Sequence, residues 1–257
     1  MACRRLIDQV NVNMNTVEVL GYPVFNDVLD SIPVTGPARV IATISPNSYG
    51  IASRTPEFRE ALLDADYLVL DGVYFGLGGL LLKGQRIRLN NGPAVFRYFM
   101  KRMSDVGGRV FFLGSSNETL ALIRARAALE YPALAVGGFS PPYAAQFSQD
   151  EVRHMIDAVN AFGPDVLFVG MTAPKQEIWA FRNGRKTNAA VVASIGAVFD
   201  WYAGTEKEIA PIWWNLRLAW LIRTIRRPEI LKRYPAIGIF FRDLLLSLLG
   251  CNRTCRK

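Results

Sequence analysis

Short apolar segments alternate along this chain with longer segments of helical spacing, and this alternation constrains the fold more than any other feature. Strands are expected at residues 39–43, 67–70, 109–113, 134–136, 166–169 and 190–195. Helices are expected at residues 56–65, 93–103, 117–130, 149–161 and 174–185. A regular exchange of strand and helix is typical of parallel sheets. The sequence therefore predicts an α/β fold with a Rossmann-like, mainly parallel sheet and helices on both faces.

Polar and turn-forming residues gather directly after these strands. They occupy residues 43–49, 71–72, 114–117 and 170–177. In open α/β sheets, ligands bind beyond the carboxyl ends of the strands. We therefore expect the functional site at that edge of the sheet.

Asp71 follows the apolar segment 68–70 directly and precedes Gly72. This position would hold its carboxylate at the carboxyl edge, where it is well placed to take a proton from an attacking hydroxyl. An ordinary Asp-Gly turn is the alternative and, from these two residues alone, the simpler explanation.

Residues 114–117, Gly-Ser-Ser-Asn, lie where a strand gives way to a helix. Backbone N–H groups and the helix dipole at such a point suit a donor diphosphate. A tight turn with Ser or Asn as the helix N-cap is the alternative. Neither a GxGxxG nor a Walker pattern occurs, so the residues alone do not decide between the two.

Asp64 and Asp66 have the spacing of a metal-binding DxD motif. They are expected to end a helix and open a strand at the amino edge of the sheet, far from the ligand side, so we assign them structural roles. His154 is the one histidine and has no Cys or His neighbour in the sequence. We expect no metal site.

The C-terminal fifth of the chain carries its charge excess. From Lys207 to Lys257 there are eleven basic and three acidic residues, a net charge of +8 that equals the formal net charge of the whole chain. Residues 237–248 have the apolar spacing of an amphipathic helix. We therefore predict a core at residues 1–204 and a basic, helical, membrane-docking appendage at residues 205–257. An ordinary solvated basic face is the alternative.

The sequence offers no candidate for a membrane span. The longest uninterrupted apolar segment, 73–82, is about half of the ~20 residues that a span requires. No apolar stretch near the start is long enough for a signal peptide. We expect a cytoplasmic protein held peripherally at the inner face of the cell membrane, with no nucleic-acid partner.

Several motifs taken in order resemble the WecG/TagA/CpsF family of bacterial glycosyltransferases over nearly the whole chain. The segments that carry the resemblance are 43–46, 65–72, 112–114, 164–170, 173–177, 196–200 and 219–223. Ala-Pro-Lys-Gln-Glu at 173–177 and Gly-x-x-Phe-Asp at 196–200 are specific in combination.

The resemblance implies inverting, metal-independent transfer from a UDP-sugar to an undecaprenyl-diphosphate-linked saccharide in exopolysaccharide or other surface polysaccharide biosynthesis, without a cofactor. It implies Asp71 as the catalytic base, with Thr43 and Gln176 as catalytic polar residues. Arg223, Arg227 and Arg233 correspond to arginines of the appendage that meet the acceptor diphosphate. The other substrate-binding candidates are Ser45, Asn47, Arg88, Gly114, Ser115, Gly170, Lys175, Glu177 and Asp200.

The sequence also departs from the family pattern. Ser45 stands where Asn is expected, Ile209 where a basic residue is expected and Ala219 where Glu is expected. The segment 43–49 is more similar to GumM-like members that add glucose in xanthan-type or acetan-type polysaccharides, so a hexose of the glucose type is the favoured donor sugar.

Other functions stay open on the sequence alone. An N-acetylmannosamine or N-acetylmannosaminuronic acid donor is the alternative within the family. A non-catalytic membrane scaffold and a nicotinamide-dependent oxidoreductase are alternatives from other classes, and the missing glycine-rich fingerprint argues against the second. Family members can associate through the core, so a homo-oligomer also stays open.

Overall fold

The computed structural model of the protein describes residues 15–205, 212–213, 221, 224 and 228–250 of the 257. Its centre is one eight-stranded sheet with the strand order β1-β2-β4-β3-β8-β7-β5-β6. The strands are β1 (Thr16–Val19), β2 (Tyr22–Phe25), β3 (Arg39–Ile44), β4 (Tyr67–Leu70), β5 (Arg109–Gly114), β6 (Ala135–Phe139), β7 (Val166–Gly170) and β8 (Val191–Ser194).

Among the described strands, only the β1–β2 pair is antiparallel, and every other pairing between neighbours is parallel. The predicted α/β fold with a mainly parallel sheet is therefore confirmed. Each of the six expected strands is present with its bounds shifted by at most a few residues.

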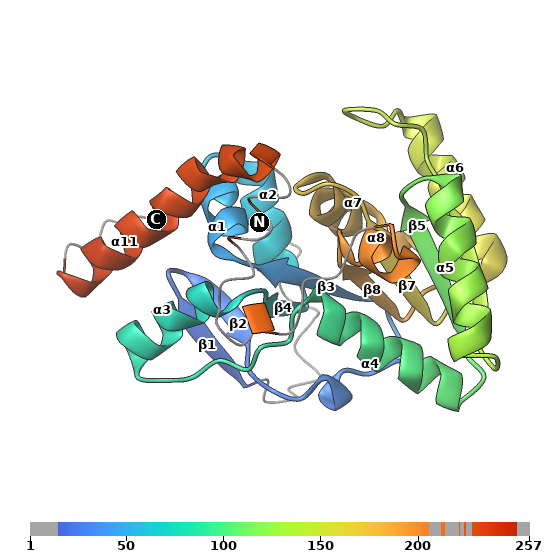
Figure 1. Ribbon diagram of the computed structural model, residues 1–257, viewed down its shortest axis with the longest axis horizontal. Helices are drawn as coiled ribbons and strands as arrows, with labels where there is room; N and C mark the ends of the chain where they lie inside the picture. The colour runs from blue at the N-terminus through green and yellow to red at the C-terminus, as the bar shows by residue number, and fades with distance from the viewer. Residues whose placement is uncertain (1–14, 206–211, 214–220, 222–223, 225–227, 251–257) are drawn as a thin grey trace, which may run out of the picture.

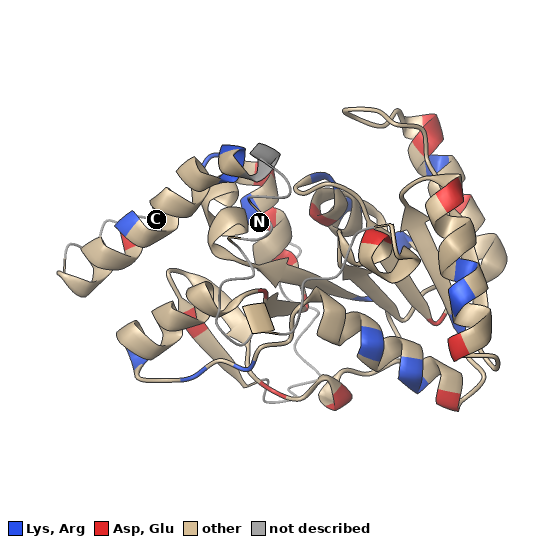
Figure 2. Ribbon diagram, viewed as in Figure 1, with Lys and Arg blue, Asp and Glu red and all other residues tan. Residues whose placement is uncertain are grey.

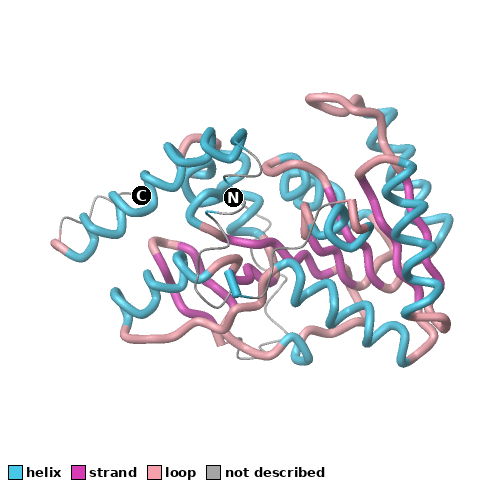
Figure 3. The backbone as a smooth tube through the Cα atoms, viewed as in Figure 1, coloured by secondary structure: helices cyan, strands magenta, loops and turns pink. Residues whose placement is uncertain are grey.

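Helices cover both faces of this sheet (Figures 1 and 3). The α-helices are α1 (Pro46–Ala52), α2 (Pro56–Asp64), α3 (Val73–Lys83), α4 (Gly92–Asp105), α5 (Asn117–Glu130), α6 (Gln149–Phe162), α7 (Lys175–Asn183), α8 (Val198–Ala203) and α11 (Tyr234–Leu248). The described residues also form the 3₁₀ turns η1 (Leu29–Ser31), η2 (Gly184–Lys186) and η3 (Pro228–Arg233).

Alternating side chains of the parallel strands supply a core on each face. On one face, residues such as Val69 and Phe112 pack against α4, α5 and α8. On the other face, residues such as Leu70 and Leu113 pack against α1, α2, α6 and α7. Strands buried on both faces read as continuous apolar runs, which is why their positions were visible in the sequence.

The β1–β2 hairpin and helix α3 were not among the predicted elements. The hairpin turns at Leu20 and Gly21, both with positive φ (49° and 83°). Primed two-residue turns of this kind match the twist of the strands and tolerate glycine best. Helix α3 is the glycine-containing apolar segment in which the sequence offered no clear period.

The C-terminal helix α11 lies against α1 and α3, far from it in sequence. Phe240 is fully buried and stacks on Phe75, with ring centroids 5.0 Å apart. The hydroxyl of Tyr49 in α1 donates to Asp243 Oδ2 at 3.0 Å. The boundary at Gly204 stays a prediction, since these contacts concern the far end of the appendage. Within the part of the chain that the structure describes, no helix is both long and apolar enough to cross a membrane.

Candidate functional site

The ends of β3 and β4 bring Asp71 and Ser45 to the same edge of the sheet. The two strands pair in parallel with Ile44 opposite Leu70. The backbone N–H of Asp71 continues this pairing by donating to Ile44 O at 2.8 Å. Asp71 is half-buried, and Gly72 after it has a φ of +89° and caps the start of α3. The Asp-Gly pair is thus a turn that also presents a carboxylate at the carboxyl edge.

Thr43 near the end of β3, Ser45 at the N-cap and Asn47 in the first turn of α1 span the passage from strand to helix. The Ser45 side chain caps α1 by accepting from Ser48 N, while Ser48 Oγ accepts from Ser45 N. The Ser45 hydroxyl therefore serves as the N-cap of α1. Asn47 Oδ1 is buried and has no hydrogen-bond partner in the described structure. A buried acceptor without a partner is costly, and a ligand hydroxyl or amide would satisfy it.

Gln176 and Glu177, in the first turn of α7, form a buried polar pair. Their exposed fractions are 4% and 3%. Gln176 Oε1 accepts from Met171 N at 3.2 Å, and its Nε2 donates to Glu177 Oε1 at 2.8 Å. Both ends of the Gln176 amide therefore have protein partners, and Gly196 from the turn after β8 lies against it.

Glu177 is a carboxyl group in an apolar setting that faces another carboxylate. Its pKa is raised to about 7, mainly by burial and in smaller part by the negative charge of Asp71, while the hydrogen bond from Gln176 opposes the rise. Its Oε2 has no hydrogen-bond partner in the described structure. Because β7, β8, β3 and β4 are parallel neighbours, α7 begins at the same carboxyl edge of the sheet at which Asp71 follows β4. The sequence predicted that Glu177 binds substrate, but it gave no sign that the side chain is buried.

Replacing Glu177 by glutamine should remove a pH dependence of folding stability. The folded-state pKa of about 7 lies above the ordinary value of 4.5, so the native state retains a proton that the unfolded chain releases. That stabilisation is complete below the unfolded-state pKa and is lost as the pH rises through about 7. As the pH rises through this range, we expect the free energy of unfolding to fall by about 3 kcal/mol more in the wild type than in Glu177→Gln.

Guanidinium denaturation across that pH range measures the effect. Glu60→Gln, which changes an exposed glutamate of α2, is the matched control and should keep the pH profile of the wild type. Parallel profiles for the wild type and Glu177→Gln would contradict a raised pKa at Glu177.

Gly114, Ser115 and Gly170 pack closely where β5 and β7 end. A Cβ on Gly114, whose φ is +119°, would lie 2.3 Å from Gly170 O. Ser115 has a φ of +61°, a conformation that non-glycine residues adopt at some energetic cost. Ser116 caps α5 by accepting from Thr119 N at 3.2 Å. The N-cap alternative is therefore present, and diphosphate binding at this turn stays a prediction.

Two further candidates have partners of their own within the protein. Lys175 donates to Ala144 O, and its ammonium lies 4.9 Å from the centroid of the Phe147 ring. It is thus held by the loop between β6 and α6. Asp200 lies half-buried in α8, where its backbone carbonyl accepts from Thr205 N at 3.1 Å.

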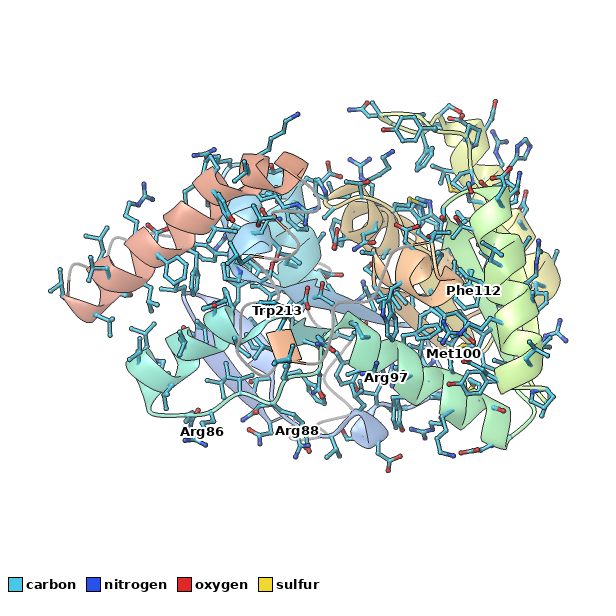
Figure 4. The ribbon with its side chains drawn as sticks, in the orientation of Figure 1. Arg86, Arg88, Arg97, Met100, Phe112 and Trp213 are labelled. Atoms are coloured by element: carbon cyan, nitrogen blue, oxygen red, sulfur yellow. The ribbon has the colours of Figure 1, made fainter. Side chains whose placement is uncertain are left out.

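Two of the candidate arginines, Arg88 and Arg233, are exposed, and the other two are not described. Arg88 is exposed between α3 and α4 (Figure 4), and its backbone N–H donates to Asn26 Oδ1 at 2.8 Å. Arg233 is exposed at the end of η3. Arg223 and Arg227 lie outside the described residues.

Asp64 and Asp66 have the structural roles that the sequence suggested. Both pair with Arg185, with N–O distances of 2.5 and 3.2 Å. Asp66 Oδ2 also accepts from Val40 N at 2.8 Å, next to the start of β3. Across the described ranges, no three His, Cys, Asp or Glu side chains are grouped so as to hold a metal ion.

The carboxyl edge thus combines a half-buried carboxylate, a buried amide and carboxyl pair, and an acceptor without a partner. These belong to Asp71, Gln176, Glu177 and Asn47. Such a group can accept a proton from a hydroxyl and hydrogen-bond a polar substrate.

Comparisons with known proteins agree on one family. The sequence model described as "Glycosyl transferase WecG/TagA/CpsF family" matches residues 10–254. A Bacillus spizizenii protein named N-acetylglucosaminyldiphosphoundecaprenol N-acetyl-beta-D-mannosaminyltransferase is 24% identical over 205 residues, which are 80% of this chain and 78% of that protein. A Staphylococcus aureus protein of the same name is 25% identical over 200 residues, 78% of this chain and 77% of its own.

Proposed function

The chain belongs to the WecG/TagA/CpsF family of glycosyl transferases, and from this premise we propose that it transfers a sugar from UDP to a saccharide carried on undecaprenyl diphosphate. The observation that carries the proposal is the half-buried carboxylate of Asp71 at the carboxyl edge, electrostatically coupled to buried Glu177. A transferase of this kind needs one carboxylate at the place where the acceptor hydroxyl attacks.

The proposed donor sugar is N-acetylmannosamine. The Bacillus and Staphylococcus relatives are named as N-acetylmannosaminyltransferases whose acceptor is N-acetylglucosamine on diphosphoundecaprenol. The segment 43–49 favoured glucose, but a resemblance over seven residues is weaker support than similarity over about 200 residues. The sequence's alternative is therefore preferred, with glucose as the second donor to test.

In the proposed reaction, Asp71 takes the proton from the acceptor hydroxyl as its oxygen forms a bond to the anomeric carbon of the donor. The bond from that carbon to the diphosphate breaks on the opposite face, so the configuration inverts and UDP leaves. Thr43 and Asn47 are proposed to hydrogen-bond the sugar, since they flank the carboxyl end of β3, which pairs with the end of β4 before Asp71. Gln176 is proposed to hold the turn after β7 in place, because both ends of its amide are occupied by protein groups.

The diphosphates have two proposed binding regions. The turn at Gly114 and Ser115 precedes a helix of fourteen residues, whose N-terminus favours anions. Arg223, Arg227 and Arg233 are proposed to bind the acceptor diphosphate through bidentate hydrogen bonds. This arrangement needs no metal ion, and we propose metal-independent transfer at the inner face of a membrane.

Turnover of a panel of UDP-sugars in excess chelator tests the proposal. We expect transfer from UDP-N-acetylmannosamine to a polyprenyl-diphosphate-linked N-acetylglucosamine to survive chelation. We expect kcat/KM for UDP-glucose to be lower by about tenfold or more, since it lacks the N-acetyl group. A radiolabelled donor and extraction of the lipid product measure both.

Three outcomes would redirect the proposal. Loss of transfer on chelation would contradict the metal-independent mechanism. A preference for UDP-glucose would restore the donor that the sequence favoured. Absence of transfer together with absence of UDP binding would favour the scaffold alternative.

A further inference from the structure

Helix α3 buries Phe75 together with two glycines and leaves most of its other large apolar residues outside. Tyr74, Leu77, Leu80 and Leu81 are 37%, 40%, 42% and 53% exposed. Gly78 and Gly79 are buried. A surface helix of a globular protein normally shows the opposite arrangement, with the large apolar side chains toward the core. Among the described residues, the outward face of α3 is therefore left largely uncovered.

Close packing explains why the inward face is made of glycine. A Cβ on Gly78 would lie 2.5 Å from Val19 Cγ1 in β1, and a Cβ on Gly79 would lie 2.7 Å from Ile87 Cδ1. A Cβ on Gly76 would lie 3.0 Å from Leu70 Cδ2 in β4. The helix backbone thus lies directly on the sheet edge and the segment after it, and this position fixes the leucines outward.

Helix α11 extends the same apolar surface. Phe241, Leu245, Leu248 and Leu249 are 43%, 57%, 45% and 68% exposed, and the first three share one helix face. The Phe241 and Tyr74 rings meet edge to face with centroids 6.5 Å apart. The two helices therefore present one surface, which we call the α3–α11 surface: Tyr74, Leu77, Leu80, Leu81, Phe241, Leu245, Leu248 and Leu249.

The end of α3 and the segment that follows it are basic. Residues 73–90 contain Lys83, Arg86 and Arg88 and no acidic residue. Arg86 and Arg88 lie at the lower rim of the molecule, on the segment that leaves α3 (Figure 4). Figure 2 shows α3 and α11 uncharged over most of their length, with Lys or Arg near the end of α3. An apolar face with a basic rim is the pattern of helices that lie in the headgroup region of anionic bilayers.

We propose that the α3–α11 surface docks the enzyme on an anionic membrane. This docking proposal rests on the proposed function, because an enzyme whose acceptor is lipid-linked has to reach a membrane. The membrane contact then includes a helix of the core, where the sequence predicted the C-terminal appendage alone. A second copy of the chain is a poorer partner, because a two-fold interface would bring the same basic rim together twice. Asp71 directly precedes the cap of α3, so docking brings the base close to the headgroup layer.

Vesicle co-sedimentation of the full chain tests the proposal. Leu81→Glu in α3 and Leu245→Glu in α11 should each weaken binding to phosphatidylcholine vesicles containing phosphatidylglycerol by about tenfold or more, the effect of removing one buried leucine. Leu129→Glu is the matched control, since Leu129 is 85% exposed near the end of α5, and it should bind as the wild type does. Vesicles without phosphatidylglycerol should bind all variants more weakly.

Equal binding of the wild type, Leu81→Glu and Leu245→Glu would overturn the proposal. So would a wild-type dimer in light scattering that Leu81→Glu converts to a monomer without a change in vesicle binding. Transfer to a short-chain, water-soluble acceptor without vesicles separates this proposal from the proposed function. Leu81→Glu should keep the wild-type turnover of this soluble acceptor. If the wild type itself shows no such turnover, the proposed function is contradicted instead.

Discussion

Replacing Asp71 by asparagine is expected to lower kcat by about 10² to 10⁴-fold, the usual contribution of a general base. Asparagine has nearly the same size and keeps the backbone N–H bond to Ile44 O, so the turn before α3 should persist. What it loses is the ability to accept the proton of the acceptor hydroxyl. UDP affinity should change little, because Asp71 is proposed to act on the acceptor and not on the nucleotide.

Steady-state turnover and UDP binding, measured on the same preparation, separate chemistry from folding. Asp150→Asn is the matched control, because the side chain of Asp150 is 77% exposed at the start of α6. It should retain the turnover of the wild type. Near-full turnover of Asp71→Asn would remove Asp71 from the proposed role and with it the inverting mechanism built on that carboxylate.

The parallel part of the fold was predictable because its strands are buried on both faces. Segments such as 67–70 and 166–169 are uniformly apolar, and the structure buries every residue of β4 and β7. Helix starts were equally legible where a cap precedes them, as at Ser148 before α6. In these elements local propensity and tertiary burial favour the same structure.

Helix α3 escaped prediction because its local signals conflict. Three glycines in eleven residues disfavour a helix, and leucines on the outer face blur the apolar period. Only the approach of β1, β4 and Ile87 explains why glycine is needed at the inner face. Contacts between segments distant in sequence decide this element, and a single sequence does not display them.

The candidate site was predictable in position and less so in detail. Asp71 and Ser45 were expected at one edge from the parallel order alone, and β3 and β4 place them there. The burial of Gln176 and Glu177 depends on how α7 packs after β7, and the sequence gave no sign that one carboxyl group there has a raised pKa. The appendage arginines were proposed from the family resemblance and the charge excess, and for Arg223 and Arg227 the proposal still rests on the sequence because both lie outside the described residues.

Replacing Gly50 by alanine should separate α11 from the core. A Cβ on Gly50 in α1 would lie 1.9 Å from Ala236 O and 2.4 Å from its carbonyl carbon, both in the backbone of α11. Backbone atoms of a helix cannot turn aside as the end of a flexible side chain can. The two helices must therefore move apart, which exposes Phe240 and Leu244. We expect the free energy of unfolding to fall by about 3 kcal/mol or more, at the upper end of overpacking effects.

Gly238→Ala is the control that makes this result specific. Gly238 is also a helical glycine, in α11, but a Cβ there would meet nothing within 4 Å. Alanine should be neutral there or stabilise the helix by up to about 1 kcal/mol, because glycine is the poorer helix former. Guanidinium denaturation gives both values, and hydrogen exchange of the α11 amides shows whether that helix has detached. If Gly50→Ala keeps the wild-type stability and α11 protection, then α11 is not anchored on α1, and the α3–α11 surface loses one of its two helices.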